Sequence, residues 1–308
     1  MNRQAVCLGD SMIDIAKARA EFEKYLDGFD RENDKIRLKI IHTNEVVRCT
    51  GEIAQRMNLS PEDRDLAGVI ALLHDIGRFE QIRLYDSFEP ATMDHARFGV
   101  QLLFGQGGVV KRQGVSDKID TCQSNSDRQK PGKEQPWIRR FVVSDRWDDI
   151  IRTAIGCHSD YSLGEIEDER TLLHARLIRD ADKLDNCRVK LVDDMQVLLS
   201  MDKEEVGKQN ITDLVYKTCR NHLSVRSADR ITKMDYWVSY IAYFFDINFK
   251  ETFQIIREQD YVNRIIDRIP YTNPDTREKM EELRCVVNRY VEENKSCKPA
   301  QSVSDTAN

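Results

Sequence analysis

Histidines and carboxylates that could bind a metal are prominent in this chain of 308 residues, which has only six histidines. His74 and Asp75 are adjacent at the end of the apolar run 68–73, within the string ALLHDIGRFE. Burying a charged carboxylate without a partner is costly, and a divalent cation would be such a partner. Imidazole and carboxylate together suit Mn, Fe, Co, Ni or Zn. The pair therefore indicates a metal site, although one His-Asp pair alone is weak evidence.

Two more segments carry residues of the same types. His42 shares one helical face with apolar side chains at 38, 46, 49 and 53, where a single histidine is more often a structural residue than a ligand. A later segment has Asp180, Asp182 and Asp185 beside an inward stripe of leucines. A solvated charged face is the alternative interpretation of these carboxylates, and it applies best to Asp185.

The order of these residues resembles the pattern of the HD superfamily of metal-dependent phosphohydrolases, which is a His, a His-Asp pair and a distant Asp. ALLHDIGR is similar to the second motif of that superfamily, and RDADKLDN is similar to its last motif. In the last motif the ligand is the Asp before Lys/Arg-Leu, which selects Asp182 over Asp180. The resemblance covers about residues 35–190. It implies that a divalent transition metal is bound by His42, His74, Asp75 and Asp182.

Two further histidines extend the resemblance. The string DHARFG at 94–99 resembles the H-x-x-x-G segment that follows the His-Asp pair in many members, and His158 stands where other members place a His. Members with both histidines often hold two metals, so we expect His95 and His158 to be ligands and two ions to bind per chain. In one-metal nucleotidases of the superfamily the first of these histidines helps catalysis near the leaving group, so both roles stay open for His95. The His-His doublet and the Gly-Tyr-Pro motif of another branch are missing, which argues against cyclic di-GMP as the substrate.

Basic residues near these positions fit a phosphorylated substrate. Arg78 follows the HDIG string and could place its guanidinium on a phosphate oxygen. Lys39 lies three residues before His42, where nucleotidase relatives often carry Arg, and Lys183 follows the metal-binding Asp. A solvated surface base is the alternative for each of them. We expect Arg78, Lys39 and Lys183 to bind the substrate.

The resemblance implies a hydrolase that cleaves a phosphate ester or anhydride by metal-activated water, and we expect the substrate to be a nucleotide. Asp75 would bridge the two ions, His95 would contribute to catalysis, and Arg78 would bind the equatorial oxygens of the phosphoryl group. One alternative is a mixed-valent di-iron oxygenase of the same superfamily, since ligand identity does not set the redox chemistry. The other is a non-catalytic nucleotide-binding HD module, against which the intact ligand set speaks.

Helices must position these residues, because nearly every long segment repeats its apolar residues at helical spacing and convincing period-two runs are absent. We predict an all-α fold, an HD-domain helical bundle with additional C-terminal helices. The helix before His74 is expected to stop at Gly77, a natural residue after a helix end. Ser11 and Asp14 are interpreted as a capping box at a helix start. The aromatic segment 227–249 is interpreted as bundle core.

The sequence also predicts how the chain is divided. The predicted parts are an N-terminal helical segment at 1–34, an HD catalytic core at 35–195, a C-terminal helical extension at 196–292 and a disordered tail at 293–308. The core contains a flexible insert at 105–136, which holds five of the fourteen glycines and two of the seven prolines and lacks periodicity. The C-terminal extension carries no motif that we can name, and we expect it to shape either the substrate pocket or a homodimer contact.

Composition restricts the class of protein and its partners. Apolar residues make up 40% and charged residues 32%, which is typical of a globular protein. The 47 Lys and Arg residues against 53 Asp and Glu residues give a net charge of −6, so we expect no stable complex with nucleic acid. Apolar runs are too short to span a bilayer, the first residues lack a secretory signal, and the eight cysteines show no C-x-x-C spacing. We therefore predict a cytoplasmic protein without membrane partners that acts on a small phosphorylated substrate.

Overall fold

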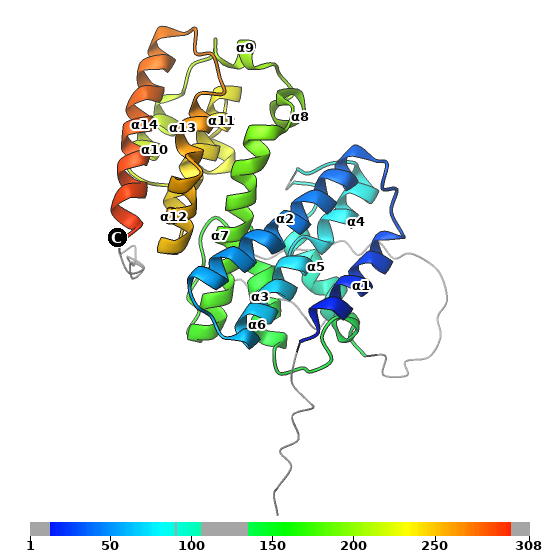
Figure 1. The fold of residues 1–308 in the computed structure, drawn as a ribbon. Helices are drawn as coiled ribbons and strands as arrows, with labels where there is room; N and C mark the ends of the chain where they lie inside the picture. The colour runs from blue at the N-terminus through cyan, green and yellow to red at the C-terminus, as the bar shows by residue number, and fades with distance from the viewer. Residues whose placement is uncertain (1–12, 90, 106–134, 297–308) are drawn as a thin grey trace, which may run out of the picture.

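Residues 13–89, 91–105 and 135–296 are described by the computed structural model of the chain (Figure 1). Within these ranges the regular elements are helices, and there is no strand. The predicted all-α fold is therefore confirmed. The predicted insert at 105–136 and the predicted tail at 293–308 lie outside the described residues except at their edges. At one edge the last helix continues to Asn294.

A first group of helices carries all the predicted site residues. It consists of α1 (Ile15–Leu26), α2 (Asp34–Arg56), α3 (Pro61–Leu73), α4 (Ile76–Tyr85), α5 (His95–Phe104), the 3₁₀ helix η2 (Trp137–Arg140), α6 (Asp148–Cys157) and α7 (Glu169–Val192). α2 packs against α3 and α7, α5 packs against α4 and α6, and α6 packs against α7. These contacts surround the junction of α3 and α4 with other helices.

A second group of helices follows α7, which runs from the first group into the second (Figure 1). It consists of α8 (Met195–Leu199), α9 (Lys203–Val206), α10 (Asp213–Arg220), η3 (Ser227–Asp229), α11 (Lys233–Ala242), η4 (Tyr243–Asp246), α12 (Lys250–Glu258), α13 (Tyr261–Ile266) and α14 (Pro274–Asn294). α12 and α13 pack against α7. Trp237 and Phe244 are almost wholly buried, in agreement with the interpretation of the aromatic segment as bundle core.

Side-chain caps begin the helices that bear site residues. Asn33, Asp94 and Asp168 each accept a hydrogen bond from a backbone N–H in the first turn of α2, α5 and α7. Such caps satisfy donors that have no partner inside the helix and stabilise it by about 1 kcal/mol each. At α1 the cap is Asp14, which accepts from the N–H of Lys17. The predicted capping box of Ser11 and Asp14 is therefore wrong, because the helix begins after Asp14.

Gly77 lies inside α4, and the prediction that a helix stops there is wrong. α3 already ends at Leu73, and the chain turns into α4 at His74 and Asp75. A Cβ on Gly77 would lie 2.2 Å from the backbone oxygen of His95 and 2.9 Å from the backbone nitrogen of Gly99. The glycine therefore serves the close approach of α4 to α5 rather than a helix end.

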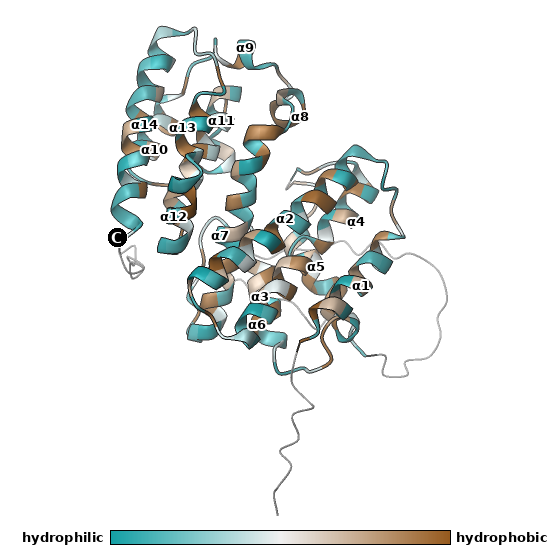
Figure 2. Cartoon of the chain, in the orientation of Figure 1, coloured by the Kyte–Doolittle hydropathy of each residue, from teal (hydrophilic) through white to brown (hydrophobic). Residues whose placement is uncertain are grey.

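Hydrophobic and hydrophilic residues alternate along the same helices (Figure 2), as expected for helices with one buried side. None of the helices in the described ranges is long and apolar enough to cross a lipid bilayer. The described cysteines, at 49, 157, 187, 219 and 285, are free thiols. Apolar packing rather than cross-linking thus holds the described helices together.

Candidate metal centre

His74 and Asp75 lie where α3 meets α4. His74 occupies the C-terminal cap of α3, and Asp75 occupies the N-terminal cap of α4. The apolar side chains at 66–73 bury the end of α3, so His74 is wholly inaccessible and Asp75 is only 3% exposed. The two helices therefore hold an imidazole and a carboxylate together in the interior of the first group.

The carboxylate of Asp75 is the centre of a cluster, and its two oxygens face different histidines. Oδ2 lies 3.6 Å from Nε2 of His42 and 3.7 Å from Nε2 of His74. Oδ1 lies 3.2 Å from Nε2 of His95 and 3.6 Å from Nε2 of His158. Within each of these groups of three residues the ligand atoms all lie within 4.8 Å of one another. One carboxylate thus joins two groups that could each hold a metal ion.

Helix ends and a fourth helix bring in the remaining residues. His95 is the first residue of α5 and His158 caps the C-terminus of α6, and their Nε2 atoms are 3.2 Å apart. Asp182 comes from α7, and its Oδ1 lies 3.1 Å from Nε2 of His42. Asn186 donates a hydrogen bond to the same oxygen at 3.0 Å. The structure therefore brings all six predicted metal ligands into one cluster, and Asp182 joins it through His42.

Hydrogen bonds at Nδ1 orient three of these histidines. In His74 and His158, Nδ1 lies 2.7 Å from the backbone oxygen three residues earlier. In His42, Nδ1 lies 2.7 Å from Oδ2 of Asp185. Because a carbonyl or carboxylate oxygen can only accept, Nδ1 carries the proton, and Nε2 of a neutral ring keeps its lone pair. In their neutral form these rings therefore direct Nε2 toward the carboxylates of the cluster, which are Asp75 for all three and also Asp182 for His42.

A cation would stabilise the imidazole nitrogens that lie close together in the cluster. Nε2 of His74 is buried and has no hydrogen-bond partner among the described residues. Buried polar atoms are normally paired, and the Nε2 atoms of His95 and His158, which lie 3.2 Å apart, are close enough to bind one cation together. Imidazole nitrogens with carboxylate oxygens are ligands that divalent transition metals bind well. The residues present therefore fit a divalent metal.

Residues 40–187 match the family model of the HD domain, a range that begins two residues before His42 and ends five residues after Asp182. This part of the chain is an HD domain, and it makes up just under half of the chain. The resemblance predicted from the sequence is thus confirmed for residues 40–187, and an HD domain with this cluster implies a superfamily of metal-dependent phosphohydrolases. Comparisons with curated proteins and with solved structures gave no match.

Burial keeps two imidazoles of the HD domain neutral. Burial lowers the pKa of His74 to about 4, and burial together with the charge of Arg78 lowers the pKa of His95 to about 3. A protonated imidazole cannot bind a metal, so these rings are in the metal-binding form at neutral pH.

In Asp75 and His42, neighbouring charges and hydrogen bonds outweigh the effect of burial on the pKa. Burial alone would raise the pKa of Asp75, but Lys39 and the surrounding histidines hold it well below its usual range. Burial and Lys39 lower the pKa of His42, yet its hydrogen bonds to two carboxylates outweigh them and leave that pKa raised. Asp75 therefore stays ionised in the interior, which is the form a cation requires.

Asp185 orients a ligand, and the prediction that it lies on a solvated face is wrong. Its side chain is buried and binds Nδ1 of His42 as well as the guanidinium of Arg188. The packing of α2 against α7 brings these residues together although 143 positions separate His42 from Asp185. The sequence signal that could have found it is its position three residues after Asp182, which puts both carboxylates on neighbouring parts of one helix face.

Arg179 fixes the end of α6 that carries His158, a role that no sequence pattern indicated. Its Nη1 donates to the carbonyl oxygens of residues 157, 158 and 160 at 3.2, 3.1 and 2.6 Å. Its Nη2 pairs with Oδ2 of Asp246 at 2.5 Å. Because Asp246 belongs to η4, the helices after α7 take part in holding the cluster.

Two of the three predicted substrate-binding cations lie directly against the cluster. Nζ of Lys39 donates to Oδ2 of Asp75 at 2.7 Å. Nε of Arg78 lies 3.7 Å from Oδ1 of Asp75 and has no hydrogen-bond partner in the described part of the chain, while Nη1 is held by the segment 81–88. Lys183 instead pairs with Asp246 at 2.8 Å. It therefore faces the C-terminal helices.

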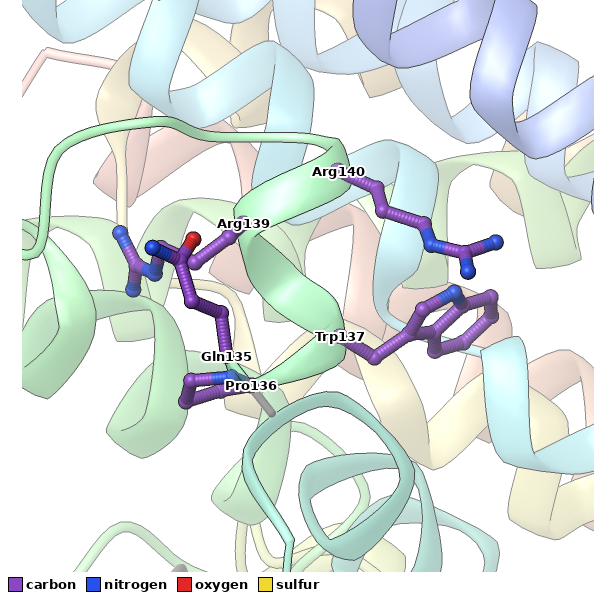
Figure 3. Close-up of a pocket in the computed structure, with 5 residues that line it drawn as sticks. All are labelled: Gln135, Pro136, Trp137, Arg139 and Arg140. Atoms are coloured by element: carbon purple, nitrogen blue, oxygen red, sulfur yellow. The ribbon is translucent and has the colours of Figure 1, made fainter. Parts of the chain in front are cut away.

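A hollow of about 460 Å³ lies elsewhere, beside η2 (Figure 3). It is lined by Gln135, Pro136, Trp137, Arg139 and Arg140. No predicted site residue borders it, and Arg139 already pairs with Asp148. Its size therefore says nothing about the chemistry of the cluster.

Proposed function

We propose that the protein is a metal-dependent phosphohydrolase that cleaves a phosphate ester or anhydride of a nucleotide with water as the nucleophile. The observation that carries this proposal is the carboxylate of Asp75, whose two oxygens each face two imidazole nitrogens. We infer two divalent transition-metal ions per chain. One would be held by His42, His74, Asp75 and Asp182, and the other by Asp75, His95 and His158.

Basic side chains at the cluster support an anionic substrate. Lys39 contacts one oxygen of Asp75, and Arg78 lies beside the other. In a protein with a net charge of −6, two cations at one buried carboxylate favour a ligand that carries negative charge. A di-iron oxygenase with the same ligand set is the competing function, and these cations favour phosphate transfer to water over it.

Residues of the chain have distinct roles in this proposal. Bound ions would lower the pKa of a water molecule and polarise a phosphoryl oxygen. Asp185 keeps the proton on Nδ1 of His42, so that Nε2 faces the cluster as a ligand. The N–H at Nε of Arg78, which lacks an acceptor, would donate to a phosphoryl oxygen beside Asp75. Because His74 and Asp75 are buried, bulk water has little access to the part of the cluster that they form.

The test is metal content followed by phosphate release. Elemental analysis of the purified protein should find about two equivalents of transition metal, and chelation should abolish phosphate release from nucleoside mono-, di- and triphosphates. Asp75→Ala should lose both ions and more than about a hundredfold in activity, because the ions contribute several kcal/mol. Asp34→Ala, which removes an exposed carboxylate from α2, is the matched control and should change neither quantity.

The results separate the competing functions. His95→Ala and His158→Ala should each lower metal content toward one equivalent, whereas His222→Ala, an exposed histidine outside the cluster, should not. Full activity of metal-free Asp75→Ala would refute the proposal. Oxygen consumption by the iron-loaded protein without phosphate release would favour the oxygenase instead.

A further inference from the structure

Lys190 is a buried cation without a polar partner. It lies near the end of α7, three residues beyond the region that matches the HD domain, and is 7% exposed. Its ammonium lies 4.0 Å from the ring centroid of Tyr240. Among the described residues it makes no hydrogen bond or ion pair through Nζ. An ammonium on an almost buried side chain is stabilised by an acceptor, and the space beside it leaves a position for one.

A small pocket adjoins Lys190 and reaches toward the cluster. Its lining includes Lys183, Asn186, Lys190, Tyr240 and Tyr243. Asn186 also donates to Asp182, so the pocket shares a wall with a proposed metal ligand. The pocket volume is about 10 Å³, about enough for one water-sized atom. This space admits a single oxygen atom, and it is too small for a nucleobase or a sugar ring.

Charges on other helices act on the same ammonium. Burial lowers the pKa of Lys190 to about 8; Lys39 on α2 also lowers it, while Asp193 and Asp182 act against this. Lys39 and Lys190 are therefore near enough to repel each other, although each approaches the cluster from a different helix. An anion close to both ammonium groups would reduce this repulsion.

The position of Lys190 on α7 indicates which part of a substrate it would meet. It follows Asp182 by eight residues, about 12 Å along the helix axis at 1.5 Å per residue. Long side chains on a helix lean toward its N-terminus, which moves the ammonium back toward Asp182. Lys190 is thus connected to Asp182 through the pocket that it shares with Asn186, rather than by direct contact.

We propose that Lys190 binds an oxygen of a second phosphate group of the substrate, next to the phosphate that is cleaved. This inference rests on the proposed function, and it narrows the substrate class to compounds with two or more linked phosphates. Tyr240 holds the ammonium against its ring, and Lys39 would contact the phosphate from α2.

Two non-hydrolysable probes test this directly. Methylenediphosphonate carries two linked phosphonate groups, and methylphosphonate carries one. Both are titrated calorimetrically into the metal-loaded protein and into Lys190→Met. We expect Lys190→Met to weaken binding of methylenediphosphonate about tenfold or more, the loss typical of a hydrogen bond to a charged group, and to leave methylphosphonate unchanged. Lys233→Met is the matched control, because Lys233 lies over the ring of Tyr236 on the same helix as Tyr240.

Thermal unfolding separates a ligand contact from a structural role. Because Lys190→Met removes an unpaired buried charge, its melting temperature should equal or exceed that of the wild type. If Lys190→Met fails to fold, Lys190→Gln takes its place in the titrations. Equal binding of methylenediphosphonate by the variant and the wild type overturns the inference and leaves a water molecule as the occupant. An equal loss for both probes also overturns it, because Lys190 would then contact the cleaved phosphate or the free phosphate product.

The metal measurements judge the proposed function separately. Wild-type protein that holds its two ions and releases phosphate, with Lys190→Met indistinguishable from it, refutes only the second-phosphate contact. Wild-type protein without metal or phosphate release refutes the proposed function itself.

Discussion

Gly77→Ala should disturb the cluster through the backbone of α5. A Cβ at this position would lie 2.2 Å from the backbone oxygen of His95, and real Cβ contacts essentially never fall below 3.0 Å, so the two helices must separate by about 0.8 Å. The obstructing atoms belong to the backbone, with the nitrogen of Gly99 at 2.9 Å, and cannot rotate away. Overpacking of this kind typically costs about 1–3 kcal/mol, and helix propensity returns at most about 1 kcal/mol.

The same displacement affects metal binding more than stability. His95 moves with its backbone, and its Nε2 lies only 3.2 Å from Oδ1 of Asp75. Metal-ligand distances tolerate about 0.2 Å, so a shift several times larger should remove the ion on the His95 side. We expect Gly77→Ala to lower the melting temperature by roughly 2–6 °C and the metal content from about two equivalents to about one.

Gly51→Ala is the matched control for this prediction. Gly51 also lies inside a helix, α2, but a Cβ there would meet nothing within 4 Å. That substitution should stabilise the protein slightly and leave metal content unchanged. If Gly77→Ala retains two equivalents of metal and melts within about 1 °C of Gly51→Ala, α4 and α5 accommodate a side chain without moving His95, which contradicts the prediction.

Three further substitutions test other contacts. Asp185→Ala leaves Nδ1 of His42 without its acceptor and should weaken metal affinity about 10–100-fold in competition with a chelator, and unchanged affinity would contradict its orienting role. Asp246→Ala leaves the buried charge of Arg179 without its carboxylate partner and should lower the free energy of unfolding, measured with denaturant, by roughly 2–4 kcal/mol. The variant should also lose the metal ion on the His158 side. Full metal occupancy would show that Arg179 holds the end of α6 without Asp246. Burial raises the pKa of Asp63, but hydrogen bonds from Ser60, Arg170 and His174 outweigh it and leave the pKa below its usual value. The ionised Asp63 therefore stabilises the folded protein at pH values above its pKa in the unfolded chain. This stabilisation is lost as the pH falls through the lower pKa of the folded state. Asp63→Asn should therefore lower the melting temperature at pH 7 and reduce its fall in acid, and parallel pH curves for both proteins would refute this.

The residue types and order of the cluster were available from the sequence alone. His42 and His74 stand on apolar helical faces, which is a local property of the chain, and the resemblance to the motifs of the superfamily selected Asp75 and Asp182. The all-α fold and the HD family followed from the same local patterns. The division of the chain at 35, 196 and 293 and the cytoplasmic location remain predictions.

Tertiary structure decided which residues support those ligands. Asp185 looked like part of a solvated face, because nothing in α7 alone reveals that α2 places His42 over it. Gly77 looked like a helix end, because only the approach of α5 shows why a side chain is excluded. These contacts join residues far apart in the chain, and local spacing carries no record of such pairs.

The same limit applies to the helices after α7. They carry no motif, yet Asp246 holds Arg179 at the end of α6, and Tyr240 covers the ammonium of Lys190. The local sequence around Asp246 and Tyr240 has no special pattern. Their partners on α7 lie 67 and 50 positions away in the chain. The sequence determined which atoms could bind a metal, because ligand chemistry belongs to single side chains. Only the packing of distant helices decided their orientation and their charged neighbours, because those depend on distances that the order of residues does not contain.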